Sequence, residues 1–473
     1  MYEPVIGLEV HAQLKTRTKA FCGCSVEFGA GANTQTCPVC LGFPGSLPVL
    51  NEKVMECGIK TALALACEVQ AFTKFDRKHY FYPDLPKSYQ ISQYDLPLAL
   101  SGFLEIEVNG ARKSIGIKRV HLEEDAGKLI HEPDCSLVDY NRAGVPLLEI
   151  VSEPHLNSPD EAYAYLVSLK AILKYLGVCD CDMEKGSLRC DANISLRKKG
   201  TSGLGTKTEL KNMNSFKSVK DALAYEIKRQ GEILASGKAV AQETRLWDDS
   251  AAKTSVMRTK EEAMDYRYFP EPDLPPFSLS AQMIKALKDA LPELPEALKA
   301  RLISAYGLSD YDVGILAADK ALADYFESCV KLYHKTKAIA NWIIGPLSRE
   351  LNTRNLTIES LGLSAQEFIL LLKAVEEGKV SALSAKDVLA EMLNTGKSAH
   401  DIISEKDLGQ VSDAGELEKI VTEALSQNEK SVEAYRAGKS NALMFLVGQV
   451  MRLSKGKANP KTAQEILKQK LSG

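Results

Sequence analysis

Charged and polar residues that could bind a metal or phosphate recur at every second position of two segments. In residues 5–14, Glu9 and His11 lie two positions apart between apolar neighbours, and Arg189 and Asp191 have the same spacing in a second segment. A β-strand turns alternate side chains to opposite faces, so each segment predicts a strand with one apolar and one polar face. These polar faces offer metal and phosphate ligands.

Two further carboxylates lie in similar surroundings. Glu149 stands alone within the apolar run of residues 145–151, and the run of acids Glu123-Glu124-Asp125 follows an alternating segment. A single charge in an apolar run is costly unless it is paired or bound to a cation. Oxygen ligands with one or two nitrogens suit Mg²⁺. The alternative is that these polar faces merely meet water, as many antiparallel strands do.

Four cysteines near the N-terminus have the spacing of a zinc site. They form two close pairs on either side of a twelve-residue loop, and we call them the cysteine quartet: Cys22, Cys24, Cys37 and Cys40. Two such pairs can wrap one tetrahedral Zn²⁺, and four thiolate ligands would make the metal structural. The alternative is four buried thiols.

The elements that must position these residues fall into a β-rich part and a helical part. Roughly the first 275 residues are mostly β by their alternation, and Asn109 with Gly110 predicts a hairpin because both accept positive φ. Helices are predicted over residues 158–177, where Ser158 supplies the N-cap, and over about residues 215–237. The proline-rich residues 268–276 predict neither helix nor strand.

Beyond the proline-rich segment the period is helical, and about the last 70 residues read as a separate small helical unit. The chain has 473 residues, which favours two or three domains. No apolar run is long enough for a membrane span and no secretory signal opens the chain, so we expect a cytoplasmic protein. A net charge of −3 excludes a wholly basic nucleic-acid coat but not a local RNA-binding patch.

Five sequence blocks resemble signatures of the B subunit family of the aspartyl/glutamyl-tRNA amidotransferases, and the resemblance runs over essentially the whole chain. These blocks are long and therefore specific. They are GLEVHAQL at 7–14, HYFYPDLPKSYQISQ at 79–93, DYNRAGVPLLEIVSEP at 139–154, SLRCDANIS at 187–195 and KTELKNMNSF at 207–216.

The resemblance implies an α+β fold in three parts. Residues 1–290 would form a mostly antiparallel β "cradle" domain with helices, which is the kinase and transamidase centre and holds zinc on the cysteine quartet. Residues 291–404 would form an all-α helical domain, and residues 405–473 a small YqeY-like tail domain that contacts tRNA.

The resemblance also implies the reactive site. Glu9, His11, Glu124 and Glu149 would form the Mg²⁺ site, with Asp191 as a further catalytic partner. The activity would be that of an ATP-dependent carbon–nitrogen ligase with glutamine as amide donor, which converts Glu-tRNA(Gln) or Asp-tRNA(Asn) to the amidated form.

A carboxylate must be activated before ammonia can displace one of its oxygens, and phosphorylation by ATP does this. Phosphoryl transfer depends mainly on positioning and charge neutralisation. No Gly-x-x-x-x-Gly-Lys-[Ser/Thr] motif occurs, so sheet residues must build the ATP site. Five basic residues are candidates for phosphate contacts, or are solvated surface charges: Lys74, Arg77, Lys78, Lys87 and Arg189.

Ammonia needs a source, and the sequence shows no glutaminase motif. The resemblance implies two partners in a heterotrimer, an amidase-fold glutaminase that releases ammonia (the A subunit) and a small clamping protein (the C subunit). The tail carries eight Lys or Arg against one acid from residue 436 onward, a net charge of +7 (8 − 1). The basic residues predicted to contact tRNA, unless they form a merely solvated face, are Arg436, Lys439, Arg452, Lys455, Lys457 and Lys461.

Two other functions compete with the ligase. One is a non-catalytic, zinc-stabilised scaffold that recruits tRNA while another protein of the complex does the chemistry. The other is a metal-dependent phosphodiesterase, because a cluster of Glu, His and Asp could activate water against RNA.

Overall fold

The computed structural model describes residues 2–259, 266–406, 408, 414–436, 439, 441–454 and 458–472. The chain divides into two compact units, the first ending at Pro295 and the second running from Glu296 to Gly473. This division lies close to the predicted boundary at residue 290. The predicted boundary between residues 404 and 405 stays a prediction.

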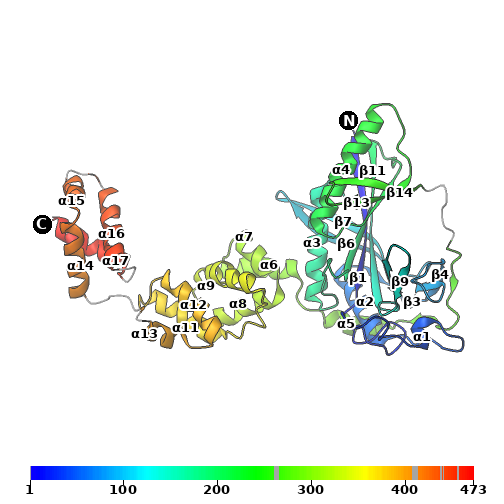
Figure 1. Ribbon diagram of the computed structural model, residues 1–473, viewed down its shortest axis with the longest axis horizontal. Coiled ribbons are helices and arrows are strands. Elements are labelled where there is room, and N and C mark those ends of the chain that lie inside the picture. The colour runs from blue at the N-terminus through cyan, green and yellow to red at the C-terminus, as the bar shows by residue number, and fades with distance from the viewer. Residues whose placement is uncertain are drawn as a thin grey trace. The chain divides into compact units, whose positions relative to one another are not determined.

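The first unit is built on a nine-stranded sheet with the order β14-β13-β12-β11-β1-β10-β7-β6-β2 (Figure 1). Its described strand pairs are antiparallel, with the exception that β12 and β13 run parallel. The sheet strands are β1 (Tyr2–Gln13), β2 (Glu68–Val69), β6 (Ala99–Val108), β7 (Ala111–Glu124), β10 (Pro146–Ser152), β11 (Leu188–Lys198), β12 (Thr208–Lys211), β13 (Glu243–Asp248) and β14 (Lys253–Thr259).

Smaller sheets flank it, and one of them contains part of the proline-rich segment. Phe269 is paired with Arg77 at the edge of a three-stranded sheet. An edge strand tolerates proline because its outer N–H needs no partner. The prediction of neither helix nor strand is therefore wrong for residues 269–270. The short strands are β3 (Phe72–Thr73), β4 (Asp76–His79), β5 (Tyr89–Ser92), β8 (Lys128–His131), β9 (Ser136–Asp139), β15 (Phe269–Pro270) and β16 (Phe277–Ser278).

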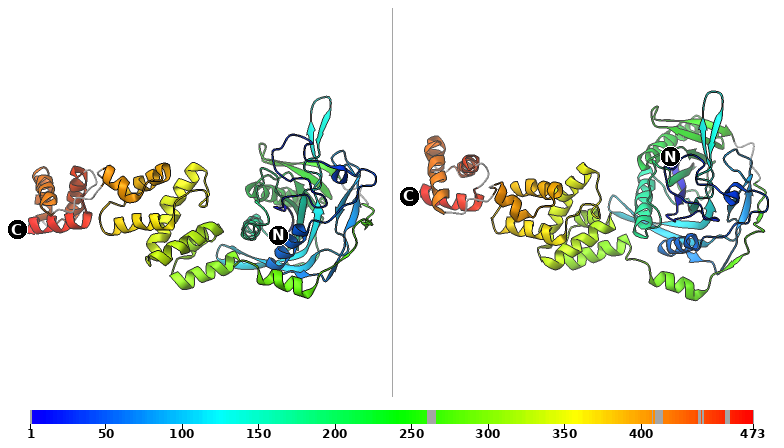
Figure 2. Two further views of the ribbon diagram at one scale, coloured as in Figure 1. Left: turned by 90° about the horizontal axis from the view of Figure 1, so that it is seen from below. Right: turned by 60° about the horizontal axis from the view of Figure 1, so that its bottom comes forward.

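The second unit consists of helices in its described part (Figure 2). One hydrophobic cluster lies wholly between Leu417 and Leu471. The α+β class with a helical C-terminal part is confirmed. The helices are α6 (Pro295–Tyr306), α7 (Asp310–Leu316), α8 (Lys320–Leu332), α9 (Thr336–Trp342), the π-helix η1 (Ile343–Leu347), α10 (Ser348–Arg354), α11 (Ala365–Glu376), α12 (Ser384–Thr395), α13 (Ala399–Glu405), α14 (Ala414–Ser426), α15 (Glu429–Arg436), α16 (Asn441–Leu453) and α17 (Pro460–Ser472).

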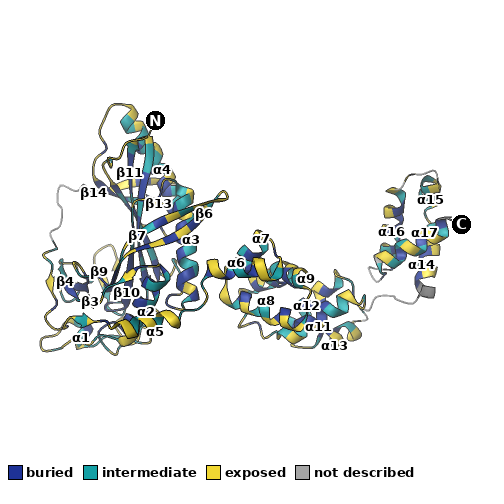
Figure 3. Cartoon of the chain, turned by 180° about the vertical axis from the view of Figure 1, so that it is seen from behind, coloured by how far each residue is buried: buried dark blue, intermediate teal, exposed yellow. Residues whose placement is uncertain are grey.

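The core of the first unit lies between the apolar face of the sheet and its helices. Leu8 and Val10 of β1 are fully buried in one cluster with Ile59, Leu169 and Leu223 of the packed helices. Figure 3 shows how buried and exposed positions are distributed over these strands and helices. Because one face is buried in this way, the alternating polar residues must point to the other face. The helices of this unit are α1 (Pro38–Leu41), α2 (Glu52–Ala64), α3 (Pro159–Tyr175), α4 (Phe216–Ala235) and α5 (Ala281–Asp289).

The local signals predicted from the sequence are confirmed. Ser158 caps α3 by accepting the N–H of Glu161, and α4 begins after Ser215, which the structure adds as its cap. Asn109 and Gly110 join β6 to β7 with φ of 53° and 77°. The hairpin joins β6 to β7, and α3 and α4 follow β10 and β12 along the chain.

Candidate active site and metal centres

The polar faces of the central strands bring their charged side chains into one row. His11 on β1 is opposite Glu149 on β10, and Glu149 is opposite His121 on β7. On the other side of β1, His11 is opposite Arg189 of β11. Directly opposed residues in antiparallel strands share a face, so the row crosses four strands on the polar side of the sheet.

The row forms a compact cluster together with Glu123 of β7. Glu149 Oε2 lies 3.0 Å from His121 Nε2 and 3.5 Å from His11 Nε2. Glu123 Oε1 lies 3.4 Å from His11 Nε2. We call His11, Glu123 and Glu149 the carboxylate–histidine cluster, because one potential ligand atom from each lies within 4.8 Å of the others.

Electrostatics keeps the carboxylates of this cluster charged. Burial raises the pKa of Glu149, but the charges and hydrogen bonds of His121 and His11 outweigh it and hold the pKa well below its usual value. Burial lowers the pKa of His121, yet Glu149 and Glu123 raise it to about 9. The pKa of His11 is raised against burial by the same two carboxylates. With a pKa of about 9, His121 is protonated at neutral pH and supplies positive charge that a divalent cation could replace.

Glu124 lies on the opposite face of β7 from this cluster. Its Oε1 accepts the N–H of Ile91 at 2.9 Å and pairs with the ammonium of Lys87. Since side chains alternate along a strand, neighbouring residues on β7 cannot both face His11. The structure therefore does not bring Glu124 to His11 and Glu149. Glu123 lies beside His11, where Glu124 was expected.

His121 was not predicted as a site residue, and of the run of acids at 123–125 the predicted ligand was Glu124, not Glu123. A signal was available, because His121 and Glu123 repeat the two-residue spacing of Glu9 and His11. Their alternation continues the polar face of β7 up to Asp125, which also faces the site. The alternation of residues 121, 123 and 125 identifies both residues, whereas the run of adjacent acids at 123–125 does not distinguish one face from the other.

Glu9 and Asp191 occupy the next row of the same face, directly opposite one another. Glu9 accepts a hydrogen bond from Asn193 Nδ2 at 2.9 Å. Burial raises the pKa of Glu9, and the charges of Glu149 and Asp191 raise it further. Asp191 is paired with the ammonium of Lys211. Both rows line one cavity of about 550 Å³.

Two of the basic residues predicted to contact phosphate, Lys78 and Arg189, line this cavity. Arg189 Nη2 lies 3.1 Å from Asp125 Oδ1, and Lys78 Nζ lies 4.9 Å from the centre of the Tyr266 ring. The other three are not among the cavity's lining residues, and carboxylates hold them: Lys74 is paired with Asp76 and Asp95, Arg77 with Glu271 and Asp273, and Lys87 with Glu124.

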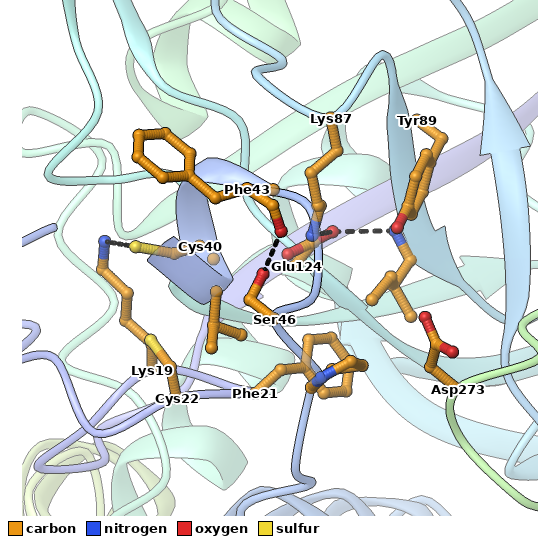
Figure 4. Close-up of a pocket in the computed structure, with 15 residues that line it drawn as sticks. Lys19, Phe21, Cys22, Cys40, Phe43, Ser46, Lys87, Tyr89, Glu124 and Asp273 are labelled. Carbon is orange, nitrogen blue, oxygen red and sulfur yellow. Dashed lines mark hydrogen bonds and ion pairs between the residues drawn. The ribbon is translucent and has the colours of Figure 1, made fainter. Parts of the chain in front are cut away.

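The cysteine quartet is brought together with one ligand atom from each residue within 4.8 Å of the others. A hydrogen bond from the Cys22 thiol lowers the pKa of Cys40 to about 4, against the effect of burial, and the Cys37 N–H and the charge of Lys19 also lower it. The fully buried Lys19 ammonium donates to Cys40 Sγ at 3.6 Å (Figure 4). Four converging sulfurs beside a buried cation fit a tetrathiolate metal site.

A separate cavity of about 190 Å³ lies beside the cysteine quartet. Its lining includes Cys22 and Cys40 on one side and Lys87, Glu124 and Tyr89 on the other (Figure 4). Glu124 therefore belongs to the surroundings of the cysteine quartet in this structure.

The tail residues predicted to contact tRNA are exposed wherever the structure describes them, whereas Lys470 is half-buried and paired with Glu418. The exposed members are Arg436, Lys439, Arg452 and Lys461. Lys455 and Lys457 lie outside the described residues.

None of the helices in the described part of the chain has the length and apolar character that a bilayer crossing requires.

Comparison with known proteins defines the class. Residues 4–285, which contain the nine-stranded sheet and both ligand clusters, match the family model of the GatB/GatE catalytic domain, and residues 324–471 match a GatB domain model. A protein of Caldanaerobacter subterraneus subsp. tengcongensis, named as the B subunit of aspartyl/glutamyl-tRNA(Asn/Gln) amidotransferase, is 55% identical over 100% of this chain and 99% of its own length. The protein of the same name from Moorella thermoacetica is 56% identical over 99% of this chain and 100% of its own length. The chain therefore belongs to the GatB family.

Proposed function

We propose that this chain is the component of a tRNA-dependent amidotransferase that activates the side-chain carboxylate of Glu-tRNA(Gln), Asp-tRNA(Asn) or both. The activity is that of an ATP-dependent ligase that forms a carbon–nitrogen bond with glutamine as amide donor. The carboxylate–histidine cluster carries this proposal, because it lines a large polar cavity in a chain that belongs to the GatB family.

The carboxylate–histidine cluster fits Mg²⁺. It offers two charged carboxylates and an imidazole, which is a suitable donor set for a hard cation. His11, Glu123 and Glu149 would hold the ion, with Glu9 within reach in the next row. Mg²⁺ bound there would supply charge neutralisation to the phosphates of ATP.

The chain's own residues position the reacting groups. Transfer of the γ-phosphoryl group to the substrate carboxylate releases ADP and forms an acyl phosphate. Ammonia then attacks the acyl carbon, and phosphate leaves with the bonding electron pair. Arg189 and Lys78 line the cavity in which this occurs and would stabilise the negative charge of the phosphates.

The ammonia comes from a partner protein, and the cysteine quartet has a structural role away from the cavity. We assign ammonia release to a glutaminase partner, the A subunit of a GatCAB heterotrimer that a small C subunit completes, in the cytoplasm where aminoacyl-tRNA is made. The cysteine quartet would hold a structural Zn²⁺, since four thiolates leave no position for water.

The basic tail would bind tRNA through phosphate contacts. Removal of the residues after 405 is expected to weaken tRNA binding while glutamine hydrolysis by the complex continues. If about four cations engage phosphates, the slope of log affinity against log salt should be about −3 in the full complex and flatter after truncation. Filter binding across a salt series measures both slopes. An unchanged tRNA affinity after truncation would refute the role of the tail.

Substitution at the polar face tests the ligase against the scaffold. His11→Ala and Glu9→Gln are each expected to abolish ATP cleavage in the assembled complex, because His11 would hold the metal and Glu9 would supply a carboxylate within reach of it. Affinity for tRNA should stay within about twofold, since the phosphate contacts of the tail are intact. Persistent amidation in both variants would favour the scaffold, whereas Mg²⁺-dependent cutting of tRNA by the wild-type chain would favour the phosphodiesterase.

A further inference from the structure

The cationic side chains around the 550 Å³ cavity differ in how far their charge is already neutralised. Arg142 and Arg189 are both paired with Asp125, at 3.6 and 3.1 Å. Lys211 is paired with Asp191. Arg119 of β7 also lines the cavity, but its side chain has no ion pair or hydrogen bond with any residue that the structure describes.

The Nε atom of Arg119 is buried and lacks a hydrogen-bond partner among the described residues. A guanidinium that is partly removed from water without an anion is unfavourable. An anion that enters the cavity from solution would neutralise this charge and accept the Nε–H of Arg119. Guanidinium presents a rigid fork of N–H donors whose geometry matches phosphate or carboxylate oxygens.

The sheet register places Arg119 beside the carboxylate–histidine cluster. Val151 of β10 is opposite Arg119 on one side and Glu9 on the other, so the three share the polar face. Arg119 also precedes His121 by two residues on the same face, a separation of about 7 Å. An anion held by Arg119 would therefore lie next to the row that contains His11 and Glu149.

We propose that Arg119 is a catalytic residue that binds the phosphoryl group in transfer, an assignment that rests on the proposed function. Its N–H groups donate to the non-bridging oxygens of the terminal phosphate of ATP. They stay bonded to those oxygens while the bond to ADP breaks and the bond to the substrate carboxylate forms. No proton moves to or from Arg119, because guanidinium stays charged throughout.

Nucleotides with different numbers of phosphates test this assignment in the assembled complex. Arg119→Met is expected to weaken binding of a non-hydrolysable ATP analogue by about 10- to 100-fold, the value of a charge-assisted hydrogen bond. The affinity of Arg119→Met for AMP should stay within about twofold of wild type. The affinity of Arg119→Lys for the ATP analogue should lie between those of wild type and Arg119→Met. Arg112→Met is the matched control, because Arg112 lies on the same strand with a side chain that is 73% exposed. Isothermal titration with Mg²⁺ present measures the affinities of all four proteins for both nucleotides.

A rescue experiment separates chemistry from structure. Added guanidinium ion at low millimolar concentration should partly restore ATP cleavage to Arg119→Ala, which a purely structural role of Arg119 would not allow. Equal loss of affinity for AMP and for the ATP analogue, or ATP cleavage unchanged in Arg119→Met, overturns the assignment. If His11→Ala stops ATP cleavage while Arg119→Met does not, the proposed function stands and the inference about Arg119 alone fails.

Discussion

Replacing Glu123 by glutamine is expected to lower the Mg²⁺ affinity of the assembled complex by at least about 100-fold and to abolish ATP cleavage. Even groups that only support a metal's ligands change its affinity by about 10- to 100-fold, and Glu123 would be a direct ligand. The amide keeps the shape of the side chain but loses the negative charge that faces His11 at 3.4 Å. Mn²⁺ as a paramagnetic substitute allows the affinity to be measured by electron paramagnetic resonance.

Glu124→Gln is the matched control, because it makes the same change at the adjacent residue on the other face of β7. Metal affinity should stay within about twofold of wild type, while the midpoint of thermal unfolding falls. The fall follows because Lys87, whose side chain is 9% exposed, would lose its carboxylate partner. If Glu124→Gln abolished metal binding and Glu123→Gln did not, the ligand set would be the one expected from the sequence blocks.

Replacing Cys40 by alanine is expected to remove zinc from the purified complex and to destabilise the first unit strongly. Structural zinc binding contributes about 10–16 kcal/mol in small domains, and only a part of this is needed here to produce a visible loss. Cys40 is a suitable position for the test, because its thiol is buried and accepts a hydrogen bond from the buried Lys19. Metal content by mass spectrometry and thermal unfolding are the two measurements.

The control for this variant is Cys57→Ala, which removes an equally buried thiol. Cys57 is 3% exposed and Cys40 is 4% exposed, but Cys57 lies on α2 outside the cysteine quartet. Zinc content should be unchanged in Cys57→Ala. Zinc-free wild-type protein that melts normally, or equal effects of the two substitutions, would contradict a structural metal at the quartet.

Several features of the fold were predictable because their causes are local. Ser158 and Ser215 begin helices by accepting backbone N–H groups a few residues away. Asn109 and Gly110 turn a hairpin because both adopt positive φ. The proline-rich segment was the exception, since the pairing of Phe269 with Arg77 depends on a strand almost two hundred residues earlier.

The structure brings together the groups that are close in sequence, whereas the groups that meet through strand pairing differ from those expected. The cysteine quartet assembled as its spacing indicated. The carboxylate–histidine cluster does not include Glu124, because the choice between two adjacent acids depends on which face of β7 is buried. The phosphate-contacting role of the basic residues was the hardest to predict. A lysine or arginine can reach several carboxylates, and the residues next to it in the sequence do not indicate which one it will pair with.

The sequence by itself determined which residues share a face of a strand, because the alternation of side chains is a property of each strand alone. It also determined that a cysteine quartet and a polar strand face exist in a GatB-like chain. The tertiary structure decided which faces meet, since β1 pairs with β10 and β11, which lie more than a hundred residues away. That pairing selects Glu123 over Glu124, adds His121, and leaves Arg119 facing the cavity without a partner among the described residues. The physical reason is that strand register is set by the packing of the whole apolar face, which no single segment contains.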